Sequence, residues 1–147
     1  LPQDFNFVGE KSELIIGNNN VIRENVVINR ATHRGCKTVI GSDNFLMEGA
    51  HISHDTVVGD RCVFGYGAKI AGDCVIDTGA VISSNVVEKA NTRVGSYAVV
   101  QAGTTFSRDV PPYIIAGGSP VGFHGVNTTI QKSAGVEEKT LKHIANA

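Results

Sequence analysis

Residues 40–70 read IGSDNFLMEGAHISHDTVVGDRCVFGYGAKI, and an apolar side chain recurs there at every sixth position. The series continues to residue 106, and only Glu88 interrupts it. Its members are Ile40, Leu46, Ile52, Val58, Phe64, Ile70, Ile76, Ile82, Glu88, Val94, Val100 and Phe106. Four positions after most members comes a small or β-branched residue, as Ala50 follows Leu46. A period of six matches neither the 3.6-residue α-helix nor a simple hairpin meander.

The hexapeptide period predicts an all-β protein, a β-helix in which three hexapeptides form one triangular coil of 18 residues. The recurring apolar side chain points inward, and the small residue, such as Cys62 or Cys74, fills the interior near a corner. Upstream, Ile16 and Ile22 keep the same phase. Segment 29–39 keeps the spacing but places Arg34 inward, so we interpret it as a loop that leaves the coil. Glu88 indicates either a local distortion or a site.

We expect the β-helix domain to span residues 1–127 and a C-terminal helical extension to span residues 128–147. The coil should stop near Pro111 and Pro112, because proline lacks a backbone donor and fixes its φ angle. Residues 136–147 predict a short helix, with acidic residues early and basic residues late. The chain opens in mid-pattern with no obvious cap, so we expect missing N-terminal coils or a partner that covers that end.

Length, charge and cysteine content narrow the class of protein. A chain of 147 residues suggests one domain with a substantial core. The net charge of −1 gives no electrostatic reason to expect nucleic acid as a partner. No run approaches the roughly 18 apolar residues that span a bilayer, so we expect no transmembrane segment. Three cysteines suit a reducing compartment, which predicts a cytoplasmic protein.

His54 and Gly72 form a pair whose predicted positions suggest catalysis. On an 18-residue period, His54 lies directly beneath Gly72, in the neighbouring coil about 4.8 Å away. An imidazole beside an unobstructed backbone N–H is the arrangement that acyl transfer needs, because the base activates a hydroxyl and the N–H stabilises an oxyanion. Asp55 could orient the His54 ring or contact a substrate. Asp55 would also stack on Asp73, and repulsion would raise the pKa of at least one of them unless a cation or hydrogen bonds intervene.

Two other interpretations of the histidines stay open. His51 and His54 could be solvated side chains on a turn, with no function. They could also form a zinc site between subunits, for which His33 is the only further histidine within reach. We expect no metal site.

Several segments together resemble the acyl-[acyl carrier protein]–UDP-N-acetylglucosamine O-acyltransferase family of lipid A biosynthesis. The similarity covers nearly the whole chain, from Gln3 to about Asn127. The segments are Ile22-Arg23-Glu24, residues 27–30, residues 40–44, residues 50–55, Ile70-Ala71-Gly72, residues 109–113 and Gly125-Val126-Asn127. Relative to this family, the chain lacks several N-terminal coils and most of the C-terminal helical domain.

The resemblance implies a left-handed parallel β-helix, a bacterial cytoplasmic homotrimer and active sites in the grooves between subunits. An acyl group would pass from an acyl carrier protein thioester to the 3-hydroxyl of a nucleotide sugar, with no cofactor. His54 then matches the general base and Gly72 the oxyanion donor. Further matches are substrate-contacting or orienting positions: Gln3, Asp4, His51, Asp55, Asp73 and Lys89. Asn127 falls in the nucleotide-contacting segment, and Ala102 falls where the family sets acyl chain length.

The chain departs from the family pattern at a few of these positions. Asn6 replaces a lysine, and Asp73 and Lys89 replace histidines. Ser133 and Ala134 replace a basic pair that binds the nucleotide. These departures keep two alternatives open: a diverged paralogue that uses acetyl-CoA or another sugar, and a non-catalytic β-helix that only assembles or binds. A zinc hydratase built on the same fold is a further alternative.

Overall fold

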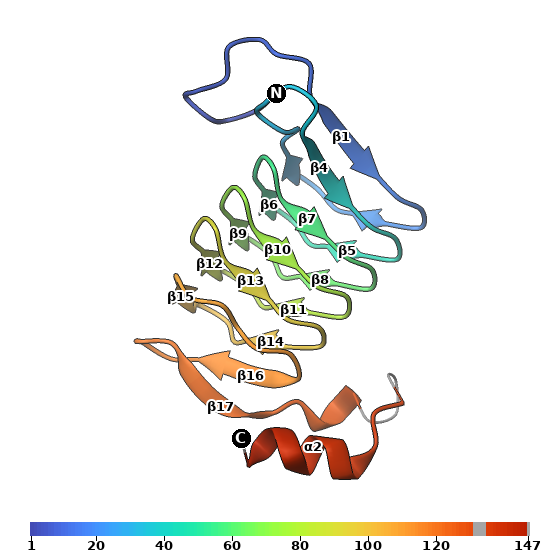
Figure 1. Ribbon diagram of the computed structural model, residues 1–147, viewed down its shortest axis with the longest axis vertical. Coiled ribbons are helices and arrows are strands. Elements are labelled where there is room, and N and C mark those ends of the chain that lie inside the picture. Colours follow the sequence, from blue (N-terminus) through green and yellow to red (C-terminus); the bar gives the residue numbers. More distant parts are fainter. Residues whose placement is uncertain (131–134, 147) are drawn as a thin grey trace.

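The chain winds into a triangular column whose walls are three sheets, with the two termini at opposite ends (Figure 1). The computed structural model describes residues 1–130 and 135–146. Most strands contain only two residues, and each is followed by a corner that turns the chain into the next wall. Successive coils therefore stack along the column, as the hexapeptide period predicts.

The three walls are named here by their order along each coil. The first sheet contains β1 (Glu13–Ile16), β4 (Lys37–Ile40), β7 (Val57–Val58), β10 (Val75–Ile76) and β13 (Arg93–Val94). The second contains β2 (Val21–Ile22), β5 (Phe45–Leu46), β8 (Val63–Phe64), β11 (Val81–Ile82), β14 (Val99–Val100), β16 (Ile114–Gly117) and β17 (Gly122–Val126). The third contains β3 (Val27–Ile28), β6 (His51–Ile52), β9 (Lys69–Ile70), β12 (Val87–Glu88) and β15 (Thr105–Phe106).

The register confirms the predicted coil length. Ile52 pairs with Ile70, and Val57 pairs with Val75, in parallel ladders. Both pairs join residues that are 18 positions apart, which is three hexapeptides. This offset holds on all three walls from β4 to β15, so there a residue's neighbour in the next coil follows directly from its number. The first coil pairs at an offset of 24, because the loop adds six residues.

The inward row of apolar side chains forms the core. Leu46, Ile52 and Phe64 are fully buried. The smaller residues near the corners, among them Ala50 and Cys62, are buried as well, as the pattern predicts. At the N-terminal end, Ile16 and Ile22 keep the inward phase but stay 41% and 43% exposed, because no coil of this chain covers them.

Two boundaries differ from the sequence prediction. The loop that leaves the coil ends at Cys36 instead of residue 39, because Lys37–Ile40 forms β4 between β1 and β7. The prolines at 111 and 112 do not stop the coil, because they occupy a corner where the ladder needs no donor from them. The next strand, β16, still pairs in parallel with β14, and the direction reverses only at β17, which is antiparallel to β16.

Glu88 does not distort the wall. Its strand β12 pairs in register with β9 and with β15, so Glu88 lies between Ile70 and Phe106 in the inward row. The side chain is only 1% exposed. Burial raises the pKa of Glu88 to about 8. The carboxyl group is therefore accommodated inside the column in its neutral form.

The C-terminal segment ends in a helix, as predicted. A short 3₁₀ helix, η1 (Thr128–Ile130), follows β17, and α2 (Glu138–Ala145) packs against β17. Glu138 lies in the first turn of α2 and Lys142 in the last, and their side chains form an ion pair of 2.9 Å. Among the described helices, none is long and apolar enough to cross a membrane.

We expect the inward and outward residues of the column to differ sharply in their contribution to stability. Ile76→Ala should lower the free energy of unfolding by about 2–5 kcal/mol, because it leaves a cavity in the inward row. Val87→Ala, an outward residue of β12 on the third sheet, is the control and should cost much less. Urea unfolding of both variants measures the difference. Equal losses would mean that the two rows do not differ as burial indicates.

Candidate active site

His54 lies at the corner between β6 and β7, and carboxylates approach both of its ring nitrogens. Its Nδ1 is 2.8 Å from Oδ2 of Asp55, and its Nε2 is 3.5 Å from Oδ2 of Asp4. The His54 side chain is 14% exposed, so one edge of the ring reaches solvent. An ionised carboxylate only accepts hydrogen bonds, so the hydrogen of a neutral His54 ring lies on Nδ1. The Nε2 lone pair is then free to accept a proton.

Asp55 is held on several sides. It adopts a left-handed backbone conformation with φ of 58°, as one residue does at nearly every corner of the column. Its backbone N–H donates to Oγ1 of Thr38, and its carboxylate accepts the backbone N–H of Thr32 at 3.0 Å. A fixed Asp55 in turn fixes the His54 ring.

Hydrogen bonds intervene at Asp55 and offset the repulsion expected from stacking on Asp73. Burial alone would raise the pKa of Asp55, but the hydrogen bonds from His54 and Thr32 outweigh burial and hold the pKa below its ordinary value. The carboxylate of Asp55 is turned toward these donors, whereas Asp73 is exposed. Asp55 therefore stays ionised beside His54.

Gly72 covers His54 from the next coil, as the 18-residue period predicts. A Cβ atom at Gly72 would lie 2.4 Å from Cε1 and 2.6 Å from Nε2 of His54, so only glycine fits above this ring. The Gly72 carbonyl accepts the backbone N–H of Asn91. Within the part of the chain that the structure describes, the Gly72 N–H donates to no acceptor. A base and a free backbone donor thus lie side by side.

The N-terminal segment closes over this corner and brings further polar groups to it. Leu1 is tied down because its carbonyl accepts the side-chain amide of Asn29 at 2.7 Å. The oxygen of the same Asn29 amide lies 2.8 Å from Nε2 of His51. Burial, with a smaller contribution from Lys69, lowers the pKa of His51, which keeps its ring neutral. Gln3 is exposed on this segment, next to Asp4.

The remaining candidates are spread over the column. Asp73 and Lys89 are exposed at the same row of corners as His54, in the two following coils. Ala102 is exposed at the row of corners that joins the second sheet to the third. Asn127 is buried, and its side-chain amide donates to the Tyr97 carbonyl at 2.8 Å, at the row that joins the first sheet to the second. Ser133 and Ala134 lie outside the described residues.

The structure therefore brings Asp4, His51, His54, Asp55 and Gly72 together, and sequence reasoning missed the residues that support them. Thr38 could have been found, because it lies 18 positions before Thr56 in the row beneath this corner. Thr32 gave no such signal, since it belongs to the loop that leaves the coil.

The described residues contain no group of three His, Cys, Asp or Glu side chains placed to hold a metal ion. His33, which the zinc alternative requires, is exposed on the loop at 29–36. This arrangement gives the zinc alternative no support.

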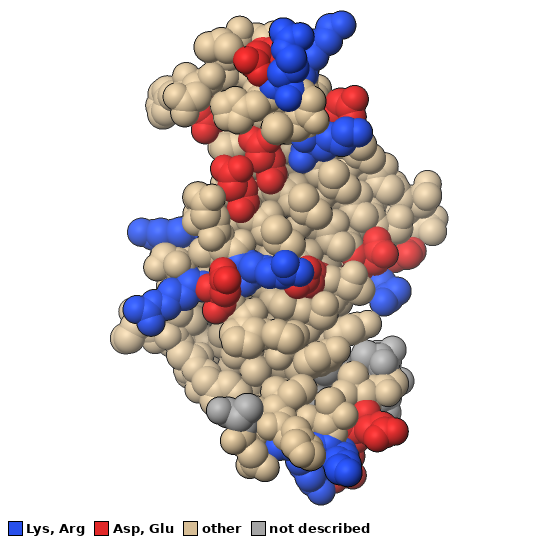
Figure 2. All heavy atoms as spheres, viewed as in Figure 1, with Lys and Arg blue, Asp and Glu red and all other residues tan. Residues whose placement is uncertain are grey.

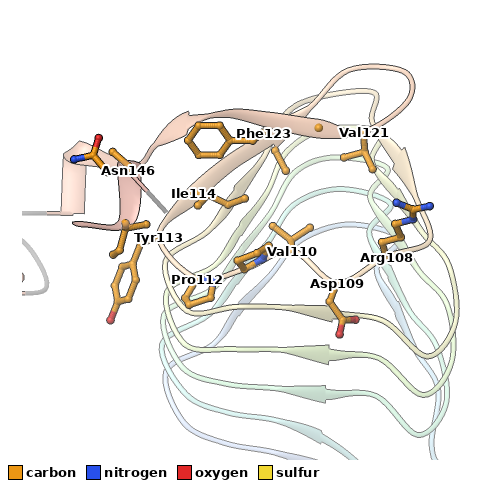
Figure 3. Close-up of a pocket in the computed structure, with 14 residues that line it drawn as sticks. Arg108, Asp109, Val110, Pro112, Tyr113, Ile114, Val121, Phe123 and Asn146 are labelled. Atoms are coloured by element: carbon orange, nitrogen blue, oxygen red, sulfur yellow. The ribbon is translucent and has the colours of Figure 1, made fainter. Parts of the chain in front are cut away.

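A large cavity lies elsewhere, at the C-terminal end of the column. It has a volume of about 930 Å³ and lies between the last coil, β17 and α2. Figure 3 shows Val110, Pro112 and Ile114 on one side and Phe123 on the other. No residue of the His54 corner lines this cavity. The His54 corner is instead an open surface with a wall on only one side.

The comparisons with known proteins agree with this fold. The family model of the bacterial transferase hexapeptide (six repeats) matches residues 37–72. An acyl-[acyl-carrier-protein]–UDP-N-acetylglucosamine O-acyltransferase from Xylella fastidiosa is 42% identical over 122 residues, which cover 82% of this chain and 46% of that protein. The same enzyme from Nautilia profundicola is 36% identical over 129 residues, 87% of this chain and 50% of that protein. The chain thus spans about half the length of the curated relatives it matches.

Solved structures give the same result. LpxA, a UDP-N-acetylglucosamine acyltransferase from Bacteroides fragilis, superposes with a TM-score of 0.94 at 44% identity. The superposition covers 99% of this chain and 57% of that one. The fold is therefore a left-handed parallel β-helix of hexapeptide repeats, and the chain is a hexapeptide-repeat protein. Within that class, it is a homologue, over most of its length, of the acyl-[acyl carrier protein]–UDP-N-acetylglucosamine O-acyltransferases.

Proposed function

We propose that this protein transfers an acyl or 3-hydroxyacyl group from acyl carrier protein to the 3-hydroxyl of UDP-N-acetylglucosamine or a related nucleotide amino sugar. The observation that carries the proposal is the His54–Asp55 pair beneath the free N–H of Gly72. Homology to enzymes named for this reaction supports the choice of substrates. The proposed reaction is an early step of lipid A biosynthesis, and we propose that it takes place in the bacterial cytoplasm.

In the proposed reaction, Nε2 of His54 accepts the proton of the sugar 3-hydroxyl while its oxygen attacks the thioester carbonyl. The N–H of Gly72 stabilises the oxyanion of the tetrahedral intermediate. Collapse of the intermediate breaks the carbon–sulfur bond, and the imidazolium returns its proton to the leaving thiolate. Asp55 stabilises the imidazolium through Nδ1. The thioester is already activated, so no cofactor is required.

The other site residues are proposed to bind substrate. Asp4 lies 3.5 Å from Nε2 of His54, so its carboxylate would accept a hydrogen bond from a second sugar hydroxyl beside the one that His54 deprotonates. Gln3 and His51 would contact the sugar beside it, and Asp73 and Lys89 continue the same row of corners toward the rest of the substrate. Ala102 would limit the acyl chain, and Asn127 would contact the nucleotide.

A homotrimer is proposed because one protomer supplies only one wall of the site. The outward side chains of the first sheet include Val39, Val57 and Val75, and those of the second include Val63 and Val81. Figure 2, viewed onto the first sheet, shows uncharged side chains over much of this face, with a band of acidic and basic side chains across its middle. Packing such faces between protomers would bury them and would add a second wall to the site.

The donor and acceptor can be tested with a panel of thioesters and nucleotide sugars. We expect a higher kcat/KM with acyl carrier protein thioesters and UDP-N-acetylglucosamine than with acetyl-CoA or other nucleotide sugars. The exposed carboxylate of Asp73, directly after Gly72, favours a second candidate, a paralogue with a different acceptor. Higher kcat/KM with acetyl-CoA or another sugar would establish that candidate instead.

Gly72→Ala should reduce activity at least about tenfold, because the new methyl group pushes the His54 ring out of position. It should also destabilise the fold, and this cost should shrink when His54 is Ala as well, because the clash is then removed. Thermal unfolding of the two single variants and the double variant measures the coupling. Additive losses of stability would show that Gly72 and His54 do not touch as described.

A further inference from the structure

A row of buried hydroxyl and thiol groups lies directly beneath the row of corners that carries His54, Gly72 and Lys89. Its members are spaced 18 residues apart and are at most 5% exposed: Thr38, Thr56, Cys74 and Thr92. The equivalent positions of the other two rows of corners are mostly Ala, Cys or Val: Asn44, Cys62, Ala80 and Ala98, and Ala50, Ala68, Val86 and Thr104. The interior is therefore polar beneath the proposed site and mostly apolar beneath the other corners.

Each side chain of this row forms a hydrogen bond with the backbone of its own corner or of a neighbouring one. Thr56 Oγ1 lies 3.2 Å from the Ala71 carbonyl. Cys74 Sγ lies 3.6 Å from the Gly72 carbonyl and 3.3 Å from the Lys89 carbonyl. Thr92 Oγ1 lies 2.7 Å from the same Lys89 carbonyl. The row thus holds the backbone on which the proposed oxyanion donor depends.

Glu88 ends the row, and its contact with Thr92 fixes which group donates. Oε1 of Glu88 is 2.8 Å from Thr92 Oγ1, which is also bonded to the Lys89 carbonyl. A hydroxyl has one hydrogen, so it cannot donate both to a carboxylate and to a carbonyl. A neutral Glu88 resolves the conflict, because its own O–H donates to Thr92, whose hydroxyl then donates to Lys89.

The surroundings of Glu88 also favour the neutral acid. Its Oε2 is buried and has no hydrogen-bond partner within the described residues. Ile70 and Phe106 flank it along the inward row. Hydrogen bonds from Thr92 and from the Cys74 thiol lower the pKa of Glu88, and the Asp109 carboxylate raises it, but burial outweighs all of them. Burial raises the pKa of Glu88 to about 8, which agrees with this geometry.

We propose that Glu88 is a positioning residue of the site and acts as a neutral carboxylic acid. Its O–H donates to Thr92, whose hydroxyl donates to the Lys89 carbonyl. This arrangement leaves the Cys74 thiol to donate to the Gly72 carbonyl. When Glu88 ionises, the Thr92 hydroxyl turns to the carboxylate and leaves the Lys89 carbonyl. The Cys74 thiol, 3.7 Å from Thr92 Oγ1, then moves its hydrogen from Gly72 to Lys89. Gly72 thereby loses one of its two donors, although Glu88 never touches substrate. This inference rests on the proposed function for its catalytic consequence only.

NMR spectroscopy can follow the effect of Glu88 ionisation on Gly72 without any assay of activity. In protein labelled with ¹⁵N-glycine, the Gly72 resonance is the one that disappears in Gly72→Ala. We expect it to shift with pH with a midpoint near that of Glu88, about 8. Glu88→Gln, whose amide can still donate to Thr92, should abolish the shift. Thr92→Val should leave the titration of the Glu88 carboxyl carbon in place and at least halve the response of Gly72. A Gly72 resonance that does not shift when Glu88 ionises would overturn the proposal.

The pH dependence of kcat is the second measurement. If only the neutral acid supports transfer, kcat one pH unit above the midpoint should be roughly a tenth of its plateau, and Glu88→Gln should remove this fall. A shared fall of kcat in wild type and Glu88→Gln would overturn the proposal while leaving the acyltransferase function standing. If the wild type transfers no acyl group at any pH, the proposed function fails, and the Gly72 resonance still decides whether the link exists.

Discussion

His54→Ala should lower kcat/KM at least about 100-fold, the lower end of the effect of a general base. The substitution removes the only ring placed between Asp55 and the Gly72 N–H among the described residues. The cavity it leaves is open to solvent on one edge, so the fold should persist. Steady-state kinetics with the best donor and acceptor measure the loss.

The matched control is His33→Ala, which removes an imidazole from an exposed loop position. This variant should retain wild-type kinetics. A folded His54→Ala protein with unchanged turnover would remove His54 from the mechanism. Comparable losses in both variants would indicate an indirect effect, such as loss of assembly.

The stability of the protein should fall as pH rises from about 4.5 to about 8, because of Glu88. Burial raises its pKa from 4.5 to about 8, so across this range the unfolded chain is ionised at Glu88 while the folded chain still holds the proton. The stabilising contribution is complete below pH 4.5 and is lost as pH rises through the folded pKa. The shift corresponds to at most about 5 kcal/mol.

Urea unfolding across this pH range, at fixed protein concentration, measures the effect. Groups such as His51 and Asp55 also contribute to the pH dependence, so the informative quantity is the difference between wild type and Glu88→Gln. That difference should grow with pH and level off above pH 8. Glu88→Ile, which restores the apolar row, should be more stable than wild type at pH 8. A difference that does not change with pH would mean that Glu88 is ionised inside the column.

The period of the sequence predicts most of the column. A solenoid converts sequence distance into spatial distance, because residues 18 positions apart become neighbours. The pairing of Ile52 with Ile70 and the position of Gly72 above His54 both follow from that rule alone. The core follows as well, since the inward row needs no tertiary information beyond its phase.

The parts that departed from prediction lie where the period gives no information. The approach of Asp4 to His54 depends on the path of the N-terminal segment, and the hydrogen bond from Thr32 to Asp55 depends on the loop at 29–36. The end of the coil was misplaced at the prolines, because they fall at a corner where no ladder donor is lost. The stacking of Asp55 on Asp73 is visible in the period, whereas the donor from the loop that helps to lower the pKa of Asp55 is not.

Glu88 shows how a break in the period carries information that the period itself does not. The sequence places this residue inward but says nothing of its partners. Its hydrogen bond to Thr92 became apparent only in three dimensions. A charged residue type inside a regular apolar row is thus best treated as a neutral, hydrogen-bonded group until its partners are known.

The central claim is that this chain joins an acyl group to the 3-hydroxyl of a nucleotide amino sugar at the His54 corner. Mass spectrometry of UDP-N-acetylglucosamine after incubation with an acyl carrier protein thioester tests it most directly. The account predicts one acyl ester on the sugar 3-oxygen for each carrier thiol released, and none with His54→Ala. A folded, assembled protein that leaves the sugar unmodified with every donor of the panel would contradict it.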